Sequence, residues 1–334
     1  MRSKLIVGEH ATRTIKWGIV GTGAAAYRFA DGMQHVSHAA ISVVWGRNRT
    51  ASDLFASVHG ALACSDLKQL LASDVDAIYI ATLPDSHAAY SLQALQFGKH
   101  VLCEKPVALN GAELEQMLQS ARVQKLLFME AMKPPFFPLY RRLRQHLVER
   151  PIGEVKFVRA GYSAPNVPTG HPSWRPESGG GSLMGIGVYQ AFLAVDWMGP
   201  AHEVQAFGRV NAERLDIFAS VQTEHARGIA QLFSGLDLST PGDAVLSGPE
   251  GHVTIHENWW NPVRATIRYK NGSIVELQEA MAGSGFNYET EHFCNLIRKG
   301  ISESPVMSHE KSRQVMQILD RVRSSVGVTF PSER

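Results

Sequence analysis

This sequence of 334 residues contains few cysteines, no long apolar run and no large excess of positive or negative charge. The three cysteines lie far apart and form no C-x-x-C pair, which argues against a disulfide framework and a zinc site. The longest apolar run, 183–195, has thirteen residues, whereas a membrane-spanning helix needs roughly 20. Lys and Arg number 33 and Asp and Glu 31, without the basic runs that bind nucleic acid or anionic membranes. We therefore expect no metal, no nucleic-acid partner and no membrane attachment.

The N-terminal residues also lack the continuous apolar stretch of an export signal. Together with the sparse cysteines, this predicts a reducing, cytoplasmic compartment. Hydrophobic residues make up 44% of the chain, enough to bury a substantial core, which excludes disorder as the main state. Residues 1–14 precede the first predicted strand and are interpreted as an N-terminal extension.

Short β-branched runs alternate with helical stretches from Ile15 to about Met132. The predicted strands are Lys16–Gly21, Ile41–Trp45, Asp76–Ala81, His100–Cys103 and Leu126–Glu130, and the helices between them include Ala24–Gln34, Asp66–Ala72, Ser86–Phe97 and Gly111–Arg122. This alternation with short connections predicts an α/β domain over 15–134, in which a doubly wound parallel sheet carries helices on both faces.

The pattern changes after Pro134. Predicted elements there are a helix over 136–149, a strand over 154–162, a loop over 163–181, a helix over 182–198 and two terminal helices, 287–299 and one from about 308. Between the helices lie several strands separated by turn signals such as Pro241-Gly242 and Asn271-Gly272. Consecutive strands joined in this way predict an α+β domain over 135–334, with a large, mostly antiparallel open sheet and helices on one face.

The run Gly21-Thr22-Gly23-Ala24-Ala25-Ala26 follows the first predicted strand and opens a helix. It is a G-x-G-x-x-A form of the Rossmann fingerprint, in which the first glycine permits a tight turn and the second lets the backbone approach a pyrophosphate. The unpaired N–H groups at the helix N-terminus suit the phosphates. The run therefore predicts a dinucleotide site that includes the residues from Gly21 to Ala25.

The end of the second strand favours NADP over NAD. An NAD site places an acid about 20 residues past the glycines to bind the ribose 2′-hydroxyl, but residues 39–52 contain none. Arg47 lies there instead and could bind a 2′-phosphate through a charge-assisted hydrogen bond worth ~1.5–3 kcal/mol. The missing acid also counts against an adenosylmethionine-dependent methyltransferase. The simpler interpretation of Arg47 is a solvated side chain at a helix start.

Two motifs follow the predicted strands Asp76–Ala81 and His100–Cys103, at the sheet edge where open parallel sheets bind ligands. They are Thr82-Leu83-Pro84-Asp85-Ser86-His87 and Glu104-Lys105-Pro106. With the glycine turn, the segment 97–106 and the later run 179–183, they make the chain resemble the Gfo/Idh/MocA oxidoreductases over about 15–331. The segments 129–132 and 303–307 are most similar to the dimeric dihydrodiol dehydrogenases and NADP-dependent xylose dehydrogenases of that family.

The resemblance implies two catalytic side chains. Lys105 would stand beside the nicotinamide and the substrate hydroxyl, where an ammonium group stabilises alkoxide charge. Tyr189 would donate and accept the proton, although a phenol titrates near ~10 and needs an adjacent cation such as Lys105 to do so near neutrality. The alternative is a tyrosine that only packs between domains. Cofactor contacts are implied for Thr82, Leu83, Pro84, His87, Glu104, Lys105, Trp174 and Arg175.

Gly185 departs from the family pattern, which has an aspartate one helical turn before the proton carrier. Glycine can neither orient that carrier nor bind a substrate hydroxyl. Two outcomes stay open: hydride transfer with altered substrate choice, or a nucleotide-binding sensor or regulatory protein with lost or reduced catalysis. His171 could partly substitute for the aspartate. Lys133, where the dihydrodiol-dehydrogenase relatives carry an aromatic residue, suggests a more polar substrate.

The main prediction is an NADP-dependent oxidoreductase that acts on a secondary alcohol of a sugar, polyol or diol, or on the matching carbonyl. Substrate contacts are expected from Lys133, His171 and Tyr189. His87, Asn287, Tyr288 and His292 are candidates for the rim of the site, and a purely structural role is an equal alternative for each. Trp259-Trp260 could form a sugar-stacking platform, although paired aromatics are more often core. Because relatives dimerise through the open sheet face, the resemblance also implies a homo-oligomer.

Overall fold

The computed structural model describes residues 13–333, so most of the predicted extension, 1–12, lies outside the described residues. The chain divides into two compact units. The first contains the segments up to Ala108, Ala112–Lys133 and Ala282–His309; the second contains Leu109–Gly111, Pro134–Met281 and the segment from Glu310. No helix within 13–333 is long and apolar enough to cross a membrane.

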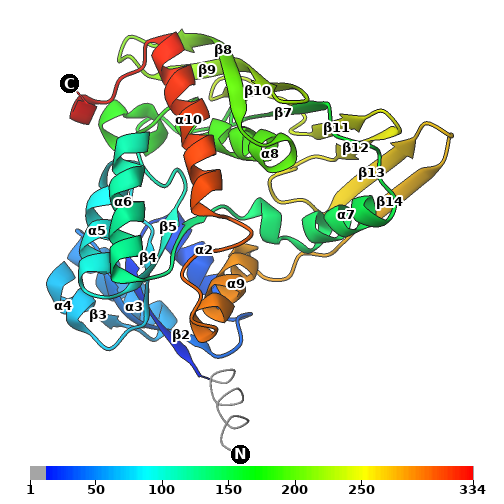
Figure 1. The fold of residues 1–334 in the computed structure, drawn as a ribbon. Coiled ribbons are helices and arrows are strands. Elements are labelled where there is room, and N and C mark those ends of the chain that lie inside the picture. Colours follow the sequence, from blue (N-terminus) through cyan, green and yellow to red (C-terminus); the bar gives the residue numbers. More distant parts are fainter. Residues whose placement is uncertain (1–12, 334) are drawn as a thin grey trace, which may run out of the picture. The chain divides into compact units, whose positions relative to one another are not determined.

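The first unit contains a six-stranded parallel sheet in the order β3-β2-β1-β4-β5-β6, which confirms the predicted doubly wound fold (Figure 1). The strands are β1 Ile15–Val20, β2 Ala39–Trp45, β3 Leu62–Ala63, β4 Ala77–Ile80, β5 His100–Glu104 and β6 Phe128–Ala131; the helices are α2 Ala24–Met33, α3 Arg49–His59, α4 Leu67–Ala72, α5 His87–Gln96, α6 Gly111–Gln124 and α9 Phe286–Arg298. Right-handed crossovers in this strand order put α2 and α3 on one face and α5 and α6 on the other.

Helix α9 returns from the far end of the chain to pack beside α2 (Figure 1). Four buried rings join it to the sheet. Trp17 of β1 contacts Phe29 of α2 and Phe293 of α9, each with ring centroids 5.3 Å apart, and Phe29 stacks on Tyr79 of β4 at 3.9 Å. Because β1 and β4 are covered on both faces, they are apolar almost throughout rather than alternating.

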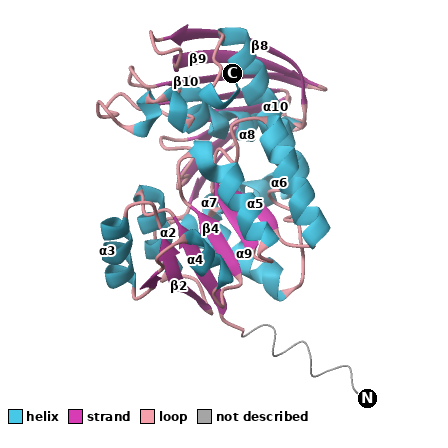
Figure 2. Ribbon diagram, turned by 90° about the vertical axis from the view of Figure 1, so that its left-hand side faces the viewer, coloured by secondary structure: helices cyan, strands magenta, loops and turns pink. Residues whose placement is uncertain are grey.

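The second unit contains an eight-stranded sheet in the order β14-β13-β12-β11-β7-β10-β9-β8, in which only the β7–β10 pair is parallel. The strands are β7 Phe157–Ser163, β8 Ala201–Val210, β9 Asp216–His225, β10 Gly228–Gly235, β11 Ala244–Gly248, β12 Gly251–Ile255, β13 Arg264–Tyr269 and β14 Ile274–Gln278; the α-helices are α7 Pro138–Glu149, α8 Val188–Met198 and α10 His309–Val326. Helices α8 and α10 lie on one side of β8–β10 (Figure 2). The predicted, mostly antiparallel sheet is confirmed.

Two segments differ from their predicted limits. The predicted helix over 182–198 is a five-residue π-helical segment, Leu183–Gly187, followed by α8; its two glycines lower the preference for regular α-helix. The helix predicted from 136 begins at Pro138, because proline suits the first helical turn, and the preceding prolines form a short 3₁₀ turn instead.

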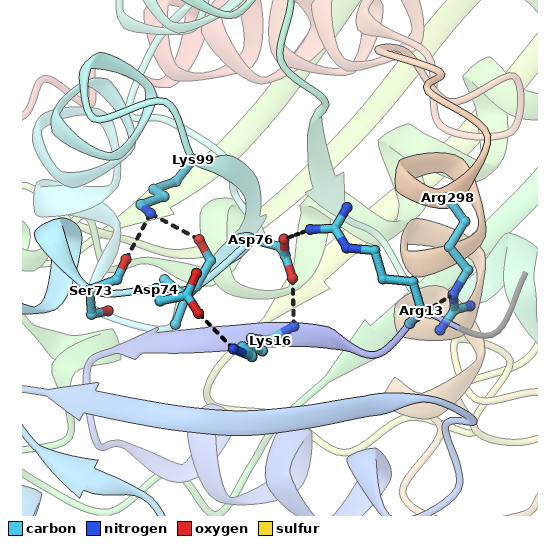
Figure 3. A network of polar contacts seen from close by, with 8 residues as sticks. Arg13, Lys16, Ser73, Asp74, Asp76, Lys99 and Arg298 are labelled. Atoms are coloured by element: carbon cyan, nitrogen blue, oxygen red, sulfur yellow. Dashed lines mark hydrogen bonds and ion pairs between the residues drawn. The ribbon is translucent and has the colours of Figure 1, made fainter. Parts of the chain in front are cut away.

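A polar network ties the N-terminal ends of β1 and β4 together (Figure 3). Asp76 accepts a hydrogen bond from the Lys16 amide at 2.8 Å and pairs with the guanidinium of Arg13. Lys99 donates to the carbonyl oxygens of Ser73 and Val75, both at 2.9 Å. This network lies at the strand ends opposite the glycine turn that follows β1, so its role is stability rather than ligand binding.

Asp76→Ala should lower the free energy of unfolding by about 1–3 kcal/mol, because the substitution removes a charged acceptor, itself only 17% exposed, from the Lys16 amide and the Arg13 guanidinium. Urea denaturation measures the change. Asp74→Ala is the matched control: its side chain is 95% exposed and forms an ion pair with Lys16 Nζ at 2.6 Å, so water screens the pair and the loss should be much smaller. Equal losses in both variants would contradict this assignment.

Candidate functional site

The glycine turn has the geometry of a phosphate cradle. Gly21 adopts φ +101°, and a Cβ there would lie 2.7 Å from the Ala81 carbonyl oxygen, so no other residue fits. Gly23 is the N-cap of α2 and makes no side-chain cap. Since the first-turn N–H groups of a helix have no intrahelical partners, this turn can bind an anion.

One pocket of the first unit gathers most of the predicted nucleotide residues. It is lined by Gly21, Thr22, Gly23, Ala24, Ala25, Trp45, Gly46, Arg47, Asn48, Ala81, Thr82, Leu83 and Tyr90. The rings of Trp45 and Tyr90 meet edge-on with centroids 5.7 Å apart. Six further residues that were predicted to contact the cofactor are not among the lining residues: Pro84, His87, Glu104, Lys105, Trp174 and Arg175. The pocket thus joins a phosphate cradle to an aromatic wall.

Arg47 is the arginine of this pocket that remains available to a ligand. It lies exposed between β2 and α3 and makes no hydrogen bond or ion pair within residues 13–333. Arg49, two residues on, pairs with Asp53 at 2.8 Å. Asn48 caps α3 by accepting from the Ala51 amide at 3.1 Å, which fixes the backbone beside Arg47. The position of Arg47 past the end of β2 suits the binding of a 2′-phosphate.

His87 serves the protein rather than a ligand, which corrects its predicted place in the cofactor site and at the rim. Its side chain is buried, with Nδ1 2.8 Å from the Pro106 carbonyl oxygen and Nε2 3.1 Å from that of Thr82. Burial lowers the pKa of the imidazole. The ring therefore holds the loop after β4 to the turn after β5, and neither nitrogen is left for a cofactor.

Lys105 follows β5 and is half-buried beside the buried charged residue Glu104. The neighbouring Glu104 carboxylate accepts from the Tyr79 hydroxyl at 2.6 Å and from the Lys105 amide at 3.2 Å. Burial lowers the pKa of Lys105 to about 8; the charges of Lys133 and Arg28 also lower it, while Glu104 raises it. A lysine with this pKa is still mainly a charged ammonium group at neutral pH and loses that charge as the pH rises through about 8.

Glu289 of α9 interacts electrostatically with Glu104 and was not predicted. It is fully buried, and neither carboxyl oxygen has a hydrogen-bond partner within residues 13–333. Burial and the charge of Glu104 raise its pKa well above the usual range, against the opposing charge of Lys133. Lys133, also buried, lies with Nζ 4.5 Å from the centre of the Phe286 ring. The sequence signal was an acid on the face of α9 that also carries Phe286 and Phe293.

Tyr189 and Gly185 belong to the second unit. Tyr189 lies in the first turn of α8 and is 9% exposed. Gly185 lies in the π-helical segment, and a Cβ added there would meet no atom within 4 Å. The space that an aspartate would fill is therefore open. The nucleotide pocket, Lys105 and Glu104 belong to the first unit.

The loop that carries His171, Trp174 and Arg175 is held by internal hydrogen bonds. His171 Nδ1 accepts from the Ser173 amide at 3.2 Å, Trp174 Nε1 donates to the Val167 carbonyl at 3.2 Å, and Arg175 donates to the Gly170 carbonyl at 2.9 Å. His171 and Arg175 are exposed. These bonds give the loop a defined conformation while leaving its polar side chains open to solvent.

The aromatic pair and the remaining rim candidates have structural roles. Trp259 is fully buried and Trp260 packs on Tyr162 with centroids 3.7 Å apart, so the suggested sugar platform is wrong. In the first unit, Asn287 accepts from the Gly285 amide at 3.1 Å and His292 contacts the Ser304 hydroxyl at 2.8 Å. The Tyr288 hydroxyl accepts from the Ala282 amide at 2.7 Å. Within residues 13–333, no group of three His, Cys, Asp or Glu could hold a metal ion.

Comparison with known proteins places both halves of the chain. Residues 15–132 match the oxidoreductase family with an NAD-binding Rossmann fold, and residues 140–286 match the GFO/IDH/MocA C-terminal domain. The chain is 31% identical to trans-1,2-dihydrobenzene-1,2-diol dehydrogenase of Xenopus laevis, over 95% of this chain and 99% of that protein. It is also 31% identical to scyllo-inositol 2-dehydrogenase (NADP(+)) of Bacillus subtilis, over 96% and 99%.

Solved structures share the fold. The 3-ketoreductase KijD10 of Actinomadura kijaniata, crystallised with NADP and TDP-benzene, superimposes with a TM-score of 0.85 over 94% of this chain and 98% of that one, at 24% identity. Levoglucosan dehydrogenase, with NADH and levoglucosan, gives the same TM-score at 18% identity over the same shares. The matched segments cover both sheets and most of the helices. The chain therefore belongs to the Gfo/Idh/MocA family of oxidoreductases, as its motifs predict.

Proposed function

We propose that this oxidoreductase is an NADP-dependent enzyme that transfers hydride to or from a secondary alcohol carbon of a sugar, polyol or diol. The observation that carries the proposal is the pocket that combines the Gly21 turn with an available Arg47 and with no acid at the end of β2. The curated relatives named above include a dihydrodiol dehydrogenase and an NADP-dependent inositol dehydrogenase, which supports this class of substrate.

The nucleotide pocket suits a phosphorylated dinucleotide. A Cβ at Gly21 would fill the cradle, and the open N-terminus of α2 provides N–H groups for the pyrophosphate. Thr22, Gly23, Ala24 and Ala25 would complete the phosphate contacts, Arg47 would bind the 2′-phosphate, and Thr82 and Leu83 would flank the nucleotide. When bound, NADP supplies or accepts the hydride.

The chain's own residues would handle the proton and the charge. We assign Tyr189 as the group that donates or accepts the hydroxyl proton, and Lys105 as the cation that stabilises negative charge on the substrate oxygen. Lys133 and His171 are proposed substrate contacts, and Trp174-Arg175 a proposed cofactor contact. In this assignment 15–134 binds the dinucleotide and 135–334 supplies substrate binding and dimerisation, with α9 of the latter segment returning to the first unit.

The direct test is a panel of sugars, polyols and dihydrodiols assayed with NADP and with NAD, in both directions. Turnover of a hydroxyl or carbonyl compound with NADP(H) supports the proposal. Tight NADPH binding, seen as enhanced nucleotide fluorescence, without turnover of any compound would overturn its catalytic half. A specific observation favours that second outcome: Gly185 leaves open the space of the family aspartate, as expected of a nucleotide-binding sensor.

Arg47→Ala should weaken NADPH binding about 10- to 100-fold and leave NADH binding unchanged. The lost charge-assisted bond to the 2′-phosphate is worth ~1.5–3 kcal/mol, and each 1.4 kcal/mol changes a dissociation constant about tenfold. Fluorescence titration measures both constants.

Arg49→Ala is the matched control for Arg47, because its guanidinium is already paired with Asp53 and its loss should change neither dissociation constant much. An equal fall in NADPH and NADH affinity in the Arg47 variant would show that this arginine does not recognise the 2′-phosphate. A fall confined to the Arg49 variant would move the assignment to that residue.

We also propose a homo-oligomer formed through the outer face of the second sheet. Helices cover the other face of β8–β10 (Figure 2), while Phe207 of β8 is 83% exposed and Ile229 of β10 is also exposed. Such apolar exposure on a sheet marks an interaction surface. Light scattering at micromolar concentration should give twice the chain mass, and Phe207→Asp should give the monomer. Val148→Asp, equally exposed but on α7, should leave the dimer intact; a monomeric wild type would contradict the proposal.

A further inference from the structure

Asp216 is a buried carboxyl group outside the machinery assigned above. It begins β9 and is fully buried. Its Oδ2 accepts one hydrogen bond from the Ser182 hydroxyl at 2.8 Å and another from the Leu183 amide at 2.7 Å. The Ser182 hydroxyl also lies 3.0 Å from that of Ser234 on β10. One carboxylate oxygen thus joins β9 to the residues that open the π-helical segment, and the Ser182 hydroxyl extends the link to β10.

The other oxygen, Oδ1, packs against the backbone of the glycine run. It has no hydrogen-bond partner within the described residues. A Cβ on Gly181 would lie 2.2 Å from it, and Gly181 adopts φ +107°. Only glycine permits this approach, so the close packing of Asp216 against this backbone requires a glycine at position 181.

The segment anchored in this way carries Tyr189. The Gly185 amide donates to the Gly181 carbonyl at 3.2 Å, and the π-helical segment leads directly into α8, whose first turn holds the tyrosine. No side chain caps the π-helical segment from its own N-cap residue. By accepting the Leu183 amide, the Asp216 carboxylate satisfies one of the unpaired N–H groups, and its charge is favourable at that end of the segment.

Burial raises the pKa of Asp216 to about 6, against hydrogen bonds from the Ser182 hydroxyl and from the backbone amides of Leu183, Asp216 and Ser182, which lower it. Ser234 faces the same group from β10 through Ser182. The charged residues of the preceding turn, Glu213 and Arg214, are exposed. The carboxyl group thus changes its charge within a pH range in which the protein can be assayed.

We propose that Asp216 is a positioning residue for Tyr189: its ionised carboxylate fixes the glycine run and the first turn of the segment that carries this tyrosine, and its protonation loosens that turn. The link to catalysis rests on the proposed role of Tyr189. The anchoring itself stands on the contacts of the second unit and can be measured without turnover.

Hydrogen exchange read by mass spectrometry tests the anchoring in the full chain. After correction for the intrinsic rate, protection of the 183–189 amides should fall as pH drops through about 6 in the wild type. Asp216→Asn, which keeps the size but not the charge, should show low protection at every pH. Ser234→Ala is the matched control and should keep the transition, because it leaves both donors to Asp216 in place. Wild-type protection that is constant between pH 5 and 8 would overturn the proposal.

Activity provides the second readout. The wild-type kcat should fall on the acid side with an apparent pKa near 6, and Asp216→Asn should lower kcat about tenfold at pH 8, remove that limb and leave the NADPH dissociation constant unchanged. An acid limb that persists in the variant would count against the proposal. If Tyr189→Phe retains full turnover while the exchange transition still follows Asp216, the proposed function fails and the anchoring stands. If the exchange profile is constant with pH while Tyr189→Phe is inactive, the anchoring by Asp216 is wrong and the proposed function stands.

Discussion

Tyr189→Phe should lower kcat by about 10²–10⁴-fold, the range that positioned proton transfer contributes, and should leave NADPH binding unchanged. The substitution removes only the phenolic oxygen from a side chain that is already nine-tenths buried in the first turn of α8, so its packing is preserved. Steady-state kinetics measures kcat, and fluorescence titration measures the NADPH dissociation constant of the same preparation.

Tyr140→Phe is the matched control, because it also removes a single hydroxyl group from a buried tyrosine. Tyr140 is buried in the second unit and donates to Asp196 at 2.5 Å, so the loss of its hydroxyl should reduce stability and leave kcat near the wild-type value. Comparable losses of kcat in both variants would mean that Tyr189 acts through packing. Full activity in the Tyr189 variant would remove this residue from the mechanism and turn attention to the exposed His171.

The fold was predictable wherever one short-range pattern decides the structure. Strands β1 and β4 are apolar almost throughout, and the Gly21 turn between β1 and α2 needs a backbone that only glycine adopts. Such signals are local, and residues 15–132 contain all six strands of the first sheet. The position of α9 was not predictable in this way, because its contact with α2 joins segments more than 250 residues apart in the chain.

The candidate site shows the same division. Gly21, Arg47 and Lys105 could be named because each follows a recognisable strand. His87 could be named from the same motif, but its burial between two carbonyl groups depends on a turn nineteen residues away. Glu289 was missed because a single acid in an amphipathic helix is ordinary, and only the folded chain brings it near Lys133 and Glu104. Charge environments formed from distant segments are thus invisible to motif reasoning.

Lys105→Met should lower kcat about 10²–10³-fold, the effect of losing one donor to a developing oxyanion. The wild-type rate should also depend on pH in a defined direction. Because burial lowers the Lys105 pKa from 10.5 to about 8, the ammonium is present below pH 8 and is lost above it. The part of kcat/KM that depends on this charge should therefore fall as pH rises through about 8, and a pH profile of the wild type measures it.

The same lowering of the pKa means that Lys105 reduces the stability of the folded state below pH 8. Between pH 8 and 10.5 the unfolded chain holds the lysine proton while the folded chain has released it, so the contribution of this group to stability rises with pH over that window. Below pH 8 both states are protonated, and the partly desolvated ammonium destabilises the folded state by roughly 1–3 kcal/mol. Lys105→Met should therefore be more stable than the wild type at pH 7 while being far less active.

Lys99→Met is the matched control. Lys99 precedes β5, whereas Lys105 follows it, and its ammonium group donates hydrogen bonds to the carbonyl oxygens of Ser73 and Val75 (Figure 3). This variant should keep the pH profile and lose stability rather than gain it. If Lys105→Met were less stable than the wild type at pH 7, the ammonium would be stabilised by its anionic neighbours, and the predicted lowering of its pKa by burial would be wrong. A gain in stability together with the loss of turnover is the result expected of a charge that the fold retains for catalysis, since packing alone would favour its removal.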